Sequence, residues 1–224
     1  MARPPPTVLA IAGGKGGCGK TTTALGLAGA LARLGRDPLV VDTDVDMPDL
    51  HLVAGSERTH TTDDVAAGVP IEAASHRTRR LPGVRLLPAG GFDSMGPALD
   101  RLASWHGPVL LDCPAGASRD AAMALRASER AVLVTLATPQ SVEDTVKTAA
   151  LARELDAPPA AALVRGADRR CHTHPGAQFE RWFSCPLEHI PHVDADVVVT
   201  DPKFQTACRG LARMVAVAQD SRNI

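Results

Sequence analysis

Residues 13–22 read GGKGGCGKTT and place two lysines and two threonines among five glycines. Glycine lets successive backbone N–H groups turn toward one centre and leaves room for phosphate oxygens to come close. A lysine and a hydroxyl at the start of a helix add a cation for those phosphates and a hard oxygen ligand for Mg²⁺. The segment therefore predicts a site for a triphosphate with a magnesium ion.

The spacing of these residues fits the phosphate-binding loop pattern G-x-x-x-x-G-K-[ST], from Gly14 to Thr21. An apolar run at residues 7–13 precedes the loop and a helical pattern follows it, which is the context that this motif requires. A glycine-rich turn without a ligand is the alternative, but such turns do not commonly carry the full pattern. The predicted nucleotide-binding residues of the loop are Gly14, Lys15, Gly16, Gly17, Cys18, Gly19, Lys20, Thr21 and Thr22.

Aspartates stand at the ends of two further apolar runs, PLVVDTD (residues 38–44) and PVLLDCP (residues 108–114). A carboxylate at the C-terminal end of a sheet strand is well placed to act on a bound nucleotide. Asp112 fits a carboxylate beside Mg²⁺, and Asp42 is expected to support the water shell of the metal or the loop itself. The predicted metal site thus combines Thr21, Asp42 and Asp112, and helix-capping aspartates are the alternative reading.

Apolar runs of strand length alternate with longer helical patterns along the chain. Strands are expected at residues 7–13, 38–44, 84–90, 108–114, 130–138, 159–166 and 187–191, and helices at residues 20–34, 141–155 and 203–218. Residues 47–80 form a looser region. This alternation predicts one doubly wound α/β domain over residues 1–224, with a mostly parallel sheet, helices on both faces and a flexible tail at residues 1–6.

The composition narrows the class of protein. The 224 residues are 45% apolar and 22% charged, and the net charge of −1 gives no reason to expect a nucleic acid or a membrane. The five cysteines are scattered, so no disulfide framework is implied and a reducing cytoplasm is favoured. No apolar run approaches the roughly 18 residues of a membrane-spanning helix. We therefore expect a cytoplasmic globular protein.

The segment KGGCGKT resembles the deviant phosphate-binding loop of the MinD/ParA group of ATPases, which carries an extra lysine near its start, here Lys15. VVDTDVDMPDL (residues 40–50) is similar to the switch I region of that group, although Asp49 stands where the group usually has Asn. DCPAG (residues 112–116) is similar to the switch II region of its MinD-like members. The likeness runs through nearly the whole chain in order.

The resemblance implies a slow, partner-stimulated ATPase that uses ATP and Mg²⁺ and forms a homodimer around ATP. Lys20 would serve its own nucleotide, Lys15 would reach the phosphates of the partner subunit, and Asp44 would orient the attacking water. Such a dimer would position or recruit a further, unidentified protein, as in placing a division site. The resemblance also makes Pro191 and Asp194 candidates for purine contacts.

Two other functions stay open. One is a DNA-partitioning ATPase, for which the basic segment HRTRRLPGVR (residues 76–85) is the feature to test. A basic patch on a near-neutral chain is more often a solvated face, so DNA is the less expected partner. The other is a nucleotide-gated scaffold that binds ATP without hydrolysing it.

Neither a zinc site nor a membrane anchor is expected near the C-terminus. A cluster near the C-terminus could bind zinc, but its spacing matches no common zinc pattern, which favours scattered surface histidines. Its members are Cys171, His172, His174, Cys185, His189 and His192. The last helix is expected to pack on the domain, with DSRNI after it, so no amphipathic membrane anchor is expected.

Overall fold

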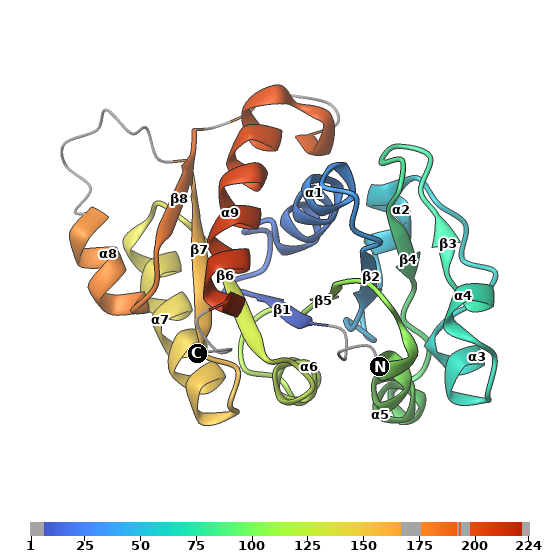
Figure 1. Ribbon diagram of the computed structural model, residues 1–224. Coiled ribbons are helices and arrows are strands. Elements are labelled where there is room, and N and C mark those ends of the chain that lie inside the picture. The colour runs from blue at the N-terminus through green and yellow to red at the C-terminus, as the bar shows by residue number, and fades with distance from the viewer. Residues whose placement is uncertain (1–6, 167–175, 192, 194–197, 221–224) are drawn as a thin grey trace.

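The computed structural model describes residues 7–166, 176–191, 193 and 198–220. Their strands form one eight-stranded sheet (Figure 1). The strands are β1 (Val8–Ala12), β2 (Leu39–Asp42), β3 (His76–Arg77), β4 (Arg85–Leu87), β5 (Val109–Asp112), β6 (Arg130–Leu136), β7 (Pro159–Arg165) and β8 (Leu187–Ile190). Their order is β3-β4-β2-β5-β1-β6-β7-β8, and every neighbouring pair is parallel except β3 with β4. The predicted fold class is confirmed, and β3 is an edge strand that the sequence analysis missed.

Helices cover both faces of the sheet. The helices α1 (Lys20–Arg33), α2 (Leu50–Ala54) and α9 (Pro202–Asp220) contribute to the apolar core on one face. The other core receives side chains from α3 (Thr62–Ala66), α4 (Ile71–Ala74), α5 (Phe92–Asp100), α6 (Arg119–Arg126), α7 (Pro139–Glu154) and α8 (Gly176–Phe183). Two short 3-10 helices, η1 (Arg101–Ser104) and η2 (Val198–Thr200), complete the described elements.

The central strands are apolar without interruption because both of their faces are covered. Along β1, Leu9 and Ile11 join the core beneath α1 and α9, whereas Ala10 and Ala12 join the core on the opposite face. All four side chains are at most 2% exposed. A strand whose successive side chains both meet helices shows no polar alternation, so its apolar run marks a central position in the sheet.

The last helix packs on the domain as predicted. Figure 1 shows α9 beside α1, and the side chains of Phe204, Cys208 and Leu211 are fully buried there. Gly26 of α1 permits this approach, because a Cβ at that position would lie 2.3 Å from the Phe204 ring. Among the described residues, no helix combines the length and the apolar character needed to cross a membrane.

The strand order brings the predicted functional segments together at one edge. After β1 the chain crosses to β2, and it later returns to place β5 between them. Asp42 at the end of β2 and Asp112 at the end of β5 are register partners, and Ile11 of β1 pairs with Asp112 from the other side. In open parallel sheets, ligands bind at the carboxyl ends of the strands, at the point where the strand order reverses.

Candidate nucleotide-binding site

The glycines between β1 and α1 serve two different purposes. Gly13 and Gly14 are tightly enclosed, because added Cβ atoms would lie 2.4 Å from the Val134 carbonyl oxygen and 2.2 Å from the Asp144 carbonyl carbon. A Cβ on Gly16 or Gly17 would meet nothing within 4 Å. Gly17 has φ of 73°, a backbone conformation that glycine adopts without strain. Gly13 and Gly14 allow the loop to pack closely against β6 and α7. Gly16 and Gly17 leave the backbone of the loop open to a ligand.

The two lysines of the loop lie in different environments. Lys20, the first residue of α1, is 8% exposed, and its Nζ donates a hydrogen bond to the Lys15 carbonyl oxygen at 3.4 Å. The Lys15 residue is exposed. A buried ammonium beside open backbone N–H groups is a cation prepared for phosphate. Lys15, in contrast, is open to solvent.

Asp42 anchors the loop that follows β2. It is 1% exposed; its Oδ1 accepts the Asp44 N–H at 3.0 Å and its Oδ2 accepts the Leu50 N–H at 3.2 Å. Burial raises the pKa of Asp42 to about 7, although both hydrogen bonds oppose the shift. Because this carboxylate ties both ends of the loop at residues 43–49 to the sheet, its geometry favours the loop-supporting role among the two predicted for it.

Asp112 presents a carboxylate oxygen with no hydrogen-bond donor. It is 3% exposed, and its buried Oδ1 has no hydrogen-bond partner within the described residues. Burial raises the pKa of Asp112 well above its usual range, and the nearby Asp42 carboxylate raises it further. A buried oxygen without a donor costs free energy unless another group satisfies it. The position therefore suits a bound cation or the water shell of one.

Two further carboxylates of the loop after β2 face the phosphate loop. Asp49 Oδ1 accepts a hydrogen bond from Thr21 Oγ1 at 3.3 Å, which joins the first turn of α1 to the start of α2. Asp44 Oδ1 accepts the Met47 N–H at 3.1 Å. Both aspartates line the same cavity as the loop glycines. The acidic loop and the phosphate loop thus form opposite walls of one site.

This cavity has a volume of about 440 Å³. Its lining residues are Gly16, Gly17, Gly19, Lys20, Thr21, Thr22, Asp44, Met47, Asp49, Val53, Asp112, Cys113, Ala115 and Arg165. The remaining predicted site residues lie elsewhere: Gly14, Lys15, Cys18 and Asp42 outside this lining, Pro191 at an exposed position after β8, and Asp194 outside the described residues. The structure thus brings together most of the predicted phosphate, metal and water-orienting residues.

Arg165 and Asp49 are lining residues whose roles the sequence analysis did not identify. Arg165 is the last residue of β7, and its Nη1 donates to the Cys18 carbonyl oxygen at 3.1 Å across the sheet. Its guanidinium fills the space where a Cβ on Gly19 would lie. An arginine at the end of a strand carries no local sign of such a contact. For Asp49, its place in the switch-like segment was the available signal.

The donor set of the cavity fits Mg²⁺. Thr21 Oγ1 and the unpartnered Asp112 Oδ1 are hard oxygen donors, which magnesium prefers. In the described residues, no group of three His, Cys, Asp or Glu side chains is arranged to hold a metal by itself. Magnesium is usually held by one or two carboxylates together with substrate phosphates, so a two-donor site is the expected form.

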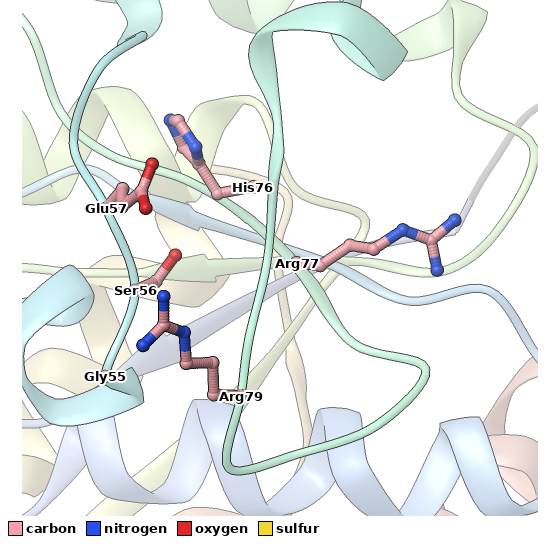
Figure 2. A pocket seen from close by; sticks show the side chains of 6 residues that line it. All are labelled: Gly55, Ser56, Glu57, His76, Arg77 and Arg79. Atoms are coloured by element: carbon pink, nitrogen blue, oxygen red, sulfur yellow. The ribbon is translucent and has the colours of Figure 1, made fainter.

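The basic segment at residues 76–85 is only partly available to a ligand. Arg80 donates to the Val53 carbonyl oxygen at 2.8 Å, and Arg85 donates to Ser75 Oγ at 2.9 Å while lying over the Trp105 ring. A separate cavity of about 350 Å³ is lined by Gly55, Ser56, Glu57, His76, Arg77 and Arg79. Figure 2 shows Arg79 directed toward Ser56, whereas the Arg77 guanidinium points away. The segment therefore does not form one continuous basic surface.

The cysteine and histidine cluster falls largely on undescribed residues. Cys171, His172, His174 and His192 lie outside the described part of the chain. Cys185 is buried against the core, where burial raises the pKa of its thiol to about 12. Burial likewise raises the pKa of the Cys18 thiol in the phosphate loop. Neither thiol is prepared to act as a nucleophile or an anionic ligand.

Comparison with known proteins agrees with this site. A model of the CobQ/CobB/MinD/ParA nucleotide binding domain matches residues 9–222. The chain is similar to the septum site-determining protein MinD of Synechocystis sp., with 32% identity over 148 residues, which are 61% of this chain and 56% of that protein. The match thus spans little more than half the length of that relative.

Solved structures extend the likeness to almost the whole chain. The cell division ATPase MinD of Pyrococcus furiosus superposes with a TM-score of 0.80 and 28% identity, covering 95% of this chain and 99% of that chain. The MinD of Pyrococcus horikoshii OT3, complexed with Mg-ADP, has the same fold, with a TM-score of 0.78, 24% identity and coverage of 94% and 98%.

The family model bears out the predicted nucleotide at the level of the family, and these relatives confirm the resemblance to the MinD/ParA group. The family model extends from the second residue of β1 to beyond the end of α9. The phosphate loop and both aspartate-bearing strand ends lie inside that match. The chain therefore belongs to the CobQ/CobB/MinD/ParA family of nucleotide-binding domains.

Proposed function

We propose that this protein is an ATPase that hydrolyses ATP to ADP and phosphate and acts as a nucleotide-dependent dimerising switch of the MinD type. The switch positions or recruits a partner protein. The observation that carries the proposal is the single cavity lined by Lys20, Thr21, Asp44 and Asp112 at the carboxyl edge of the sheet. Two of its relatives are MinD proteins named for septum-site determination and cell division, which supports a positioning role.

In the proposed reaction the chain positions the triphosphate and neutralises its charge. The open backbone at Gly16 and Gly17 and the Lys20 ammonium receive the β- and γ-phosphates. Thr21 and Asp112 are the residues that would hold Mg²⁺, which supplies charge stabilisation at the phosphates when bound. Asp44 orients the water that attacks the γ-phosphate, and Asp42 keeps the Asp44 backbone in place.

The exposed Lys15 supports the proposed ATP-dependent dimerisation. Two triphosphates in facing subunits repel each other unless cations lie between them. Lys15 extends from the loop into solvent while Lys20 remains buried, so Lys15 is the residue that would cross to the partner subunit. ATP then favours the dimer because the crossing lysine gains a γ-phosphate, and hydrolysis removes that contact.

The test compares Lys15→Ala with Asp44→Ala by light scattering in ATP and by phosphate release. Lys15→Ala keeps ATP binding but loses the ATP-dependent dimer, and its hydrolysis falls by roughly 10³, as for other cations supplied across an interface. Asp44→Ala loses hydrolysis but accumulates the ATP dimer. A Lys15→Ala protein that dimerises in ATP like the wild type contradicts the crossing role.

The two alternatives are separated by simple measurements. A DNA-partitioning ATPase binds nonspecific DNA in a salt-sensitive manner. This reading is weaker because Arg80 and Arg85 are engaged by the fold. A non-hydrolysing scaffold binds ATP tightly but releases no phosphate, with or without a protein partner.

A further inference from the structure

A groove separate from the nucleotide cavity runs between α5 and α6. Figure 1 shows these two helices beside each other on the same face of the sheet. The groove has a volume of about 550 Å³, and Phe92, Gly96, Pro97, Ala122 and Met123 form its apolar floor and walls. Asp93, Arg119 and Arg126 carry the charges at its rim. It is large enough to receive several side chains of another polypeptide.

Two exposed arginines make the rim of the groove positively charged. Arg119 stacks over the Phe92 ring, with its Cζ 4.3 Å from the ring centroid. Within the described residues neither Arg119 nor Arg126 forms an ion pair, and both are exposed. Among the lining residues two cations stand against one carboxylate, Asp93, which leaves an excess of positive charge that the buried Asp120 beside Arg119 offsets only in part. An apolar floor with such a rim complements a segment that is apolar on one side and acidic at its edges.

The spacing of the two arginines indicates the shape of that segment. Arg119 and Arg126 are seven residues apart on α6, which is about two helical turns or roughly 10 Å along the axis. Carboxylates two turns apart on a second helix, aligned with α6, would meet both guanidinium groups. The same helix would present apolar side chains at i, i+3, i+4 and i+7 to the floor.

The groove is also placed to sense the nucleotide. α6 begins at Arg119, directly after the switch II segment at residues 112–116, whose Asp112 and Ala115 line the nucleotide cavity. The buried Asp120 in the first turn of α6 lies within electrostatic reach of Asp46 and Asp44 in the acidic loop. A shift of the segment between β5 and α6 would therefore move one wall of the groove.

We propose that the α5–α6 groove is a docking site for an acidic, amphipathic helical segment of a partner protein. The docking itself is independent of the proposed ATPase function, and only its coupling to nucleotide rests on that function. Arg119 and Arg126 pair with the carboxylates of the segment, and the floor at Gly96 and Met123 receives its apolar side chains. The groove would thus provide a partner-binding surface whose shape changes with the state of the nucleotide cavity.

The test uses two synthetic, fluorescein-labelled helical peptides of roughly 16 residues, and binding is measured by fluorescence anisotropy. Both peptides carry the same leucine stripe; one has glutamates along its flanks and the other has lysines. The acidic peptide should bind saturably and at least roughly tenfold more tightly than the basic one, with an affinity that falls as salt rises. No saturable binding, or equal binding of the two peptides, overturns the proposal.

A matched pair of variants locates the binding in the groove. A Cβ at Gly96 would meet Met123 Sδ at 3.8 Å, an ordinary van der Waals contact, so Gly96→Ala fits and should keep peptide binding. Gly96→Leu fills the groove and should weaken binding at least roughly tenfold. The double variant Arg119→Glu with Arg126→Glu should lose the preference for the acidic peptide. If Gly96→Leu and the double variant both bind like the wild type, the groove is not the site.

ATP affinity is measured in parallel on every variant. Gly96→Leu and the double variant should bind ATP like the wild type, since none of the substituted residues lines the nucleotide cavity. Lys20→Ala should still bind the acidic peptide while losing ATP, which separates failure of the groove from failure of the proposed function. A nucleotide-free dimer that Gly96→Leu abolishes would overturn the assignment to a partner protein in favour of a second copy of this chain.

Discussion

The phosphate loop at residues 13–19 and the acidic loop at residues 43–49 lie across one cavity but are stabilised in opposite ways. The phosphate loop presents open backbone at Gly16 and Gly17, with the single buried Lys20 ammonium beside it. The acidic loop depends on side chains, because Asp42 holds its backbone and Asp44 and Asp49 face the cavity. One wall attracts phosphate, whereas the other gathers negative charge that repels it.

The electrostatic consequence differs between the two walls. Burial and neighbouring carboxylates raise the pKa values of Asp42 and Asp112, so ionising them without a cation is unfavourable. The phosphate loop is complete as folded, whereas the Asp112 carboxylate in the wall of the cavity is satisfied only when a metal or a proton offsets its charge. The comparison teaches that the site is prepared for phosphate and metal together rather than for either alone. Four predictions test this difference, beginning with the largest expected effect.

Lys20→Ala should nearly abolish ATP binding. The variant removes the buried cation of the phosphate loop, and losing one partner of a buried, charged pair costs about 2–5 kcal/mol. At about 1.4 kcal/mol for each factor of ten, the affinity should fall roughly 30- to 4,000-fold. Isothermal titration calorimetry with Mg·ATP measures the loss, and circular dichroism controls for folding. Unchanged affinity would contradict the assignment of the phosphate loop.

Asp112→Asn should separate metal binding from stability. Because the variant loses a carboxylate at the magnesium position, hydrolysis at saturating Mg·ATP should fall by about a hundredfold. The thermal midpoint in EDTA at pH 8 should not fall, since the variant also removes a carboxyl group whose charged form is disfavoured by burial. Phosphate release and differential scanning fluorimetry measure the two effects. A large loss of stability in EDTA with normal hydrolysis would reverse this account of the carboxylate wall.

The metal-free protein should lose stability as the pH rises. The pKa of Asp42 is about 7 in the folded protein, against an ordinary value of 3.8, so folding favours its protonated form. Its stabilising contribution is complete below about pH 4 and is lost as the pH rises through about 7, by an amount of order a few kcal/mol. The midpoint in EDTA should therefore fall by roughly 5–10 °C between pH 5 and pH 8.

The matched control for this pH dependence is Asp42→Asn, which removes one of the two buried carboxylates with raised pKa values and should reduce the slope, leaving the contribution of Asp112. The comparison uses the difference between midpoints at the two pH values, because the amide also loses one of the backbone hydrogen bonds that Asp42 accepts. Equal slopes for the wild type and Asp42→Asn would show that other groups control the pH dependence.

Gly17→Ala should have the smallest effect and act on the phosphate wall. The space beside Gly17 is open, but its φ of 73° costs an alanine about 1 kcal/mol. Gly16 has equally open space without positive φ, so Gly16→Ala is the control and should leave stability within about 0.5 kcal/mol of the wild type. Urea unfolding measures both. A larger loss for Gly16→Ala than for Gly17→Ala would show that the positive φ is not what limits substitution in the loop.

The sequence by itself determined the elements and the motif-bearing residues of this protein. Uninterrupted apolar runs identified β1, β2 and β5 because strands covered on both faces need no polar alternation. The spacing from Gly14 to Thr21 identified the phosphate loop because phosphate recognition there depends on consecutive backbone groups. Such features are local in the chain, so a single sequence displays them. The short edge strand β3 escaped because two residues carry no periodic signal.

The tertiary structure alone decided which distant residues meet. Arg165 reaches the Cys18 carbonyl only because β7 lies two strands from β1, and the two loop-holding hydrogen bonds of Asp42 depend on the path of residues 43–50. The lack of a partner for Asp112 Oδ1 among the described residues and the groove between α5 and α6 likewise arise from packing between segments far apart in sequence. All of these features have the same physical cause. Hydrogen bonding, desolvation and cavity shape depend on which residues are neighbours in space, and the spacing of residues along the chain does not specify those neighbours.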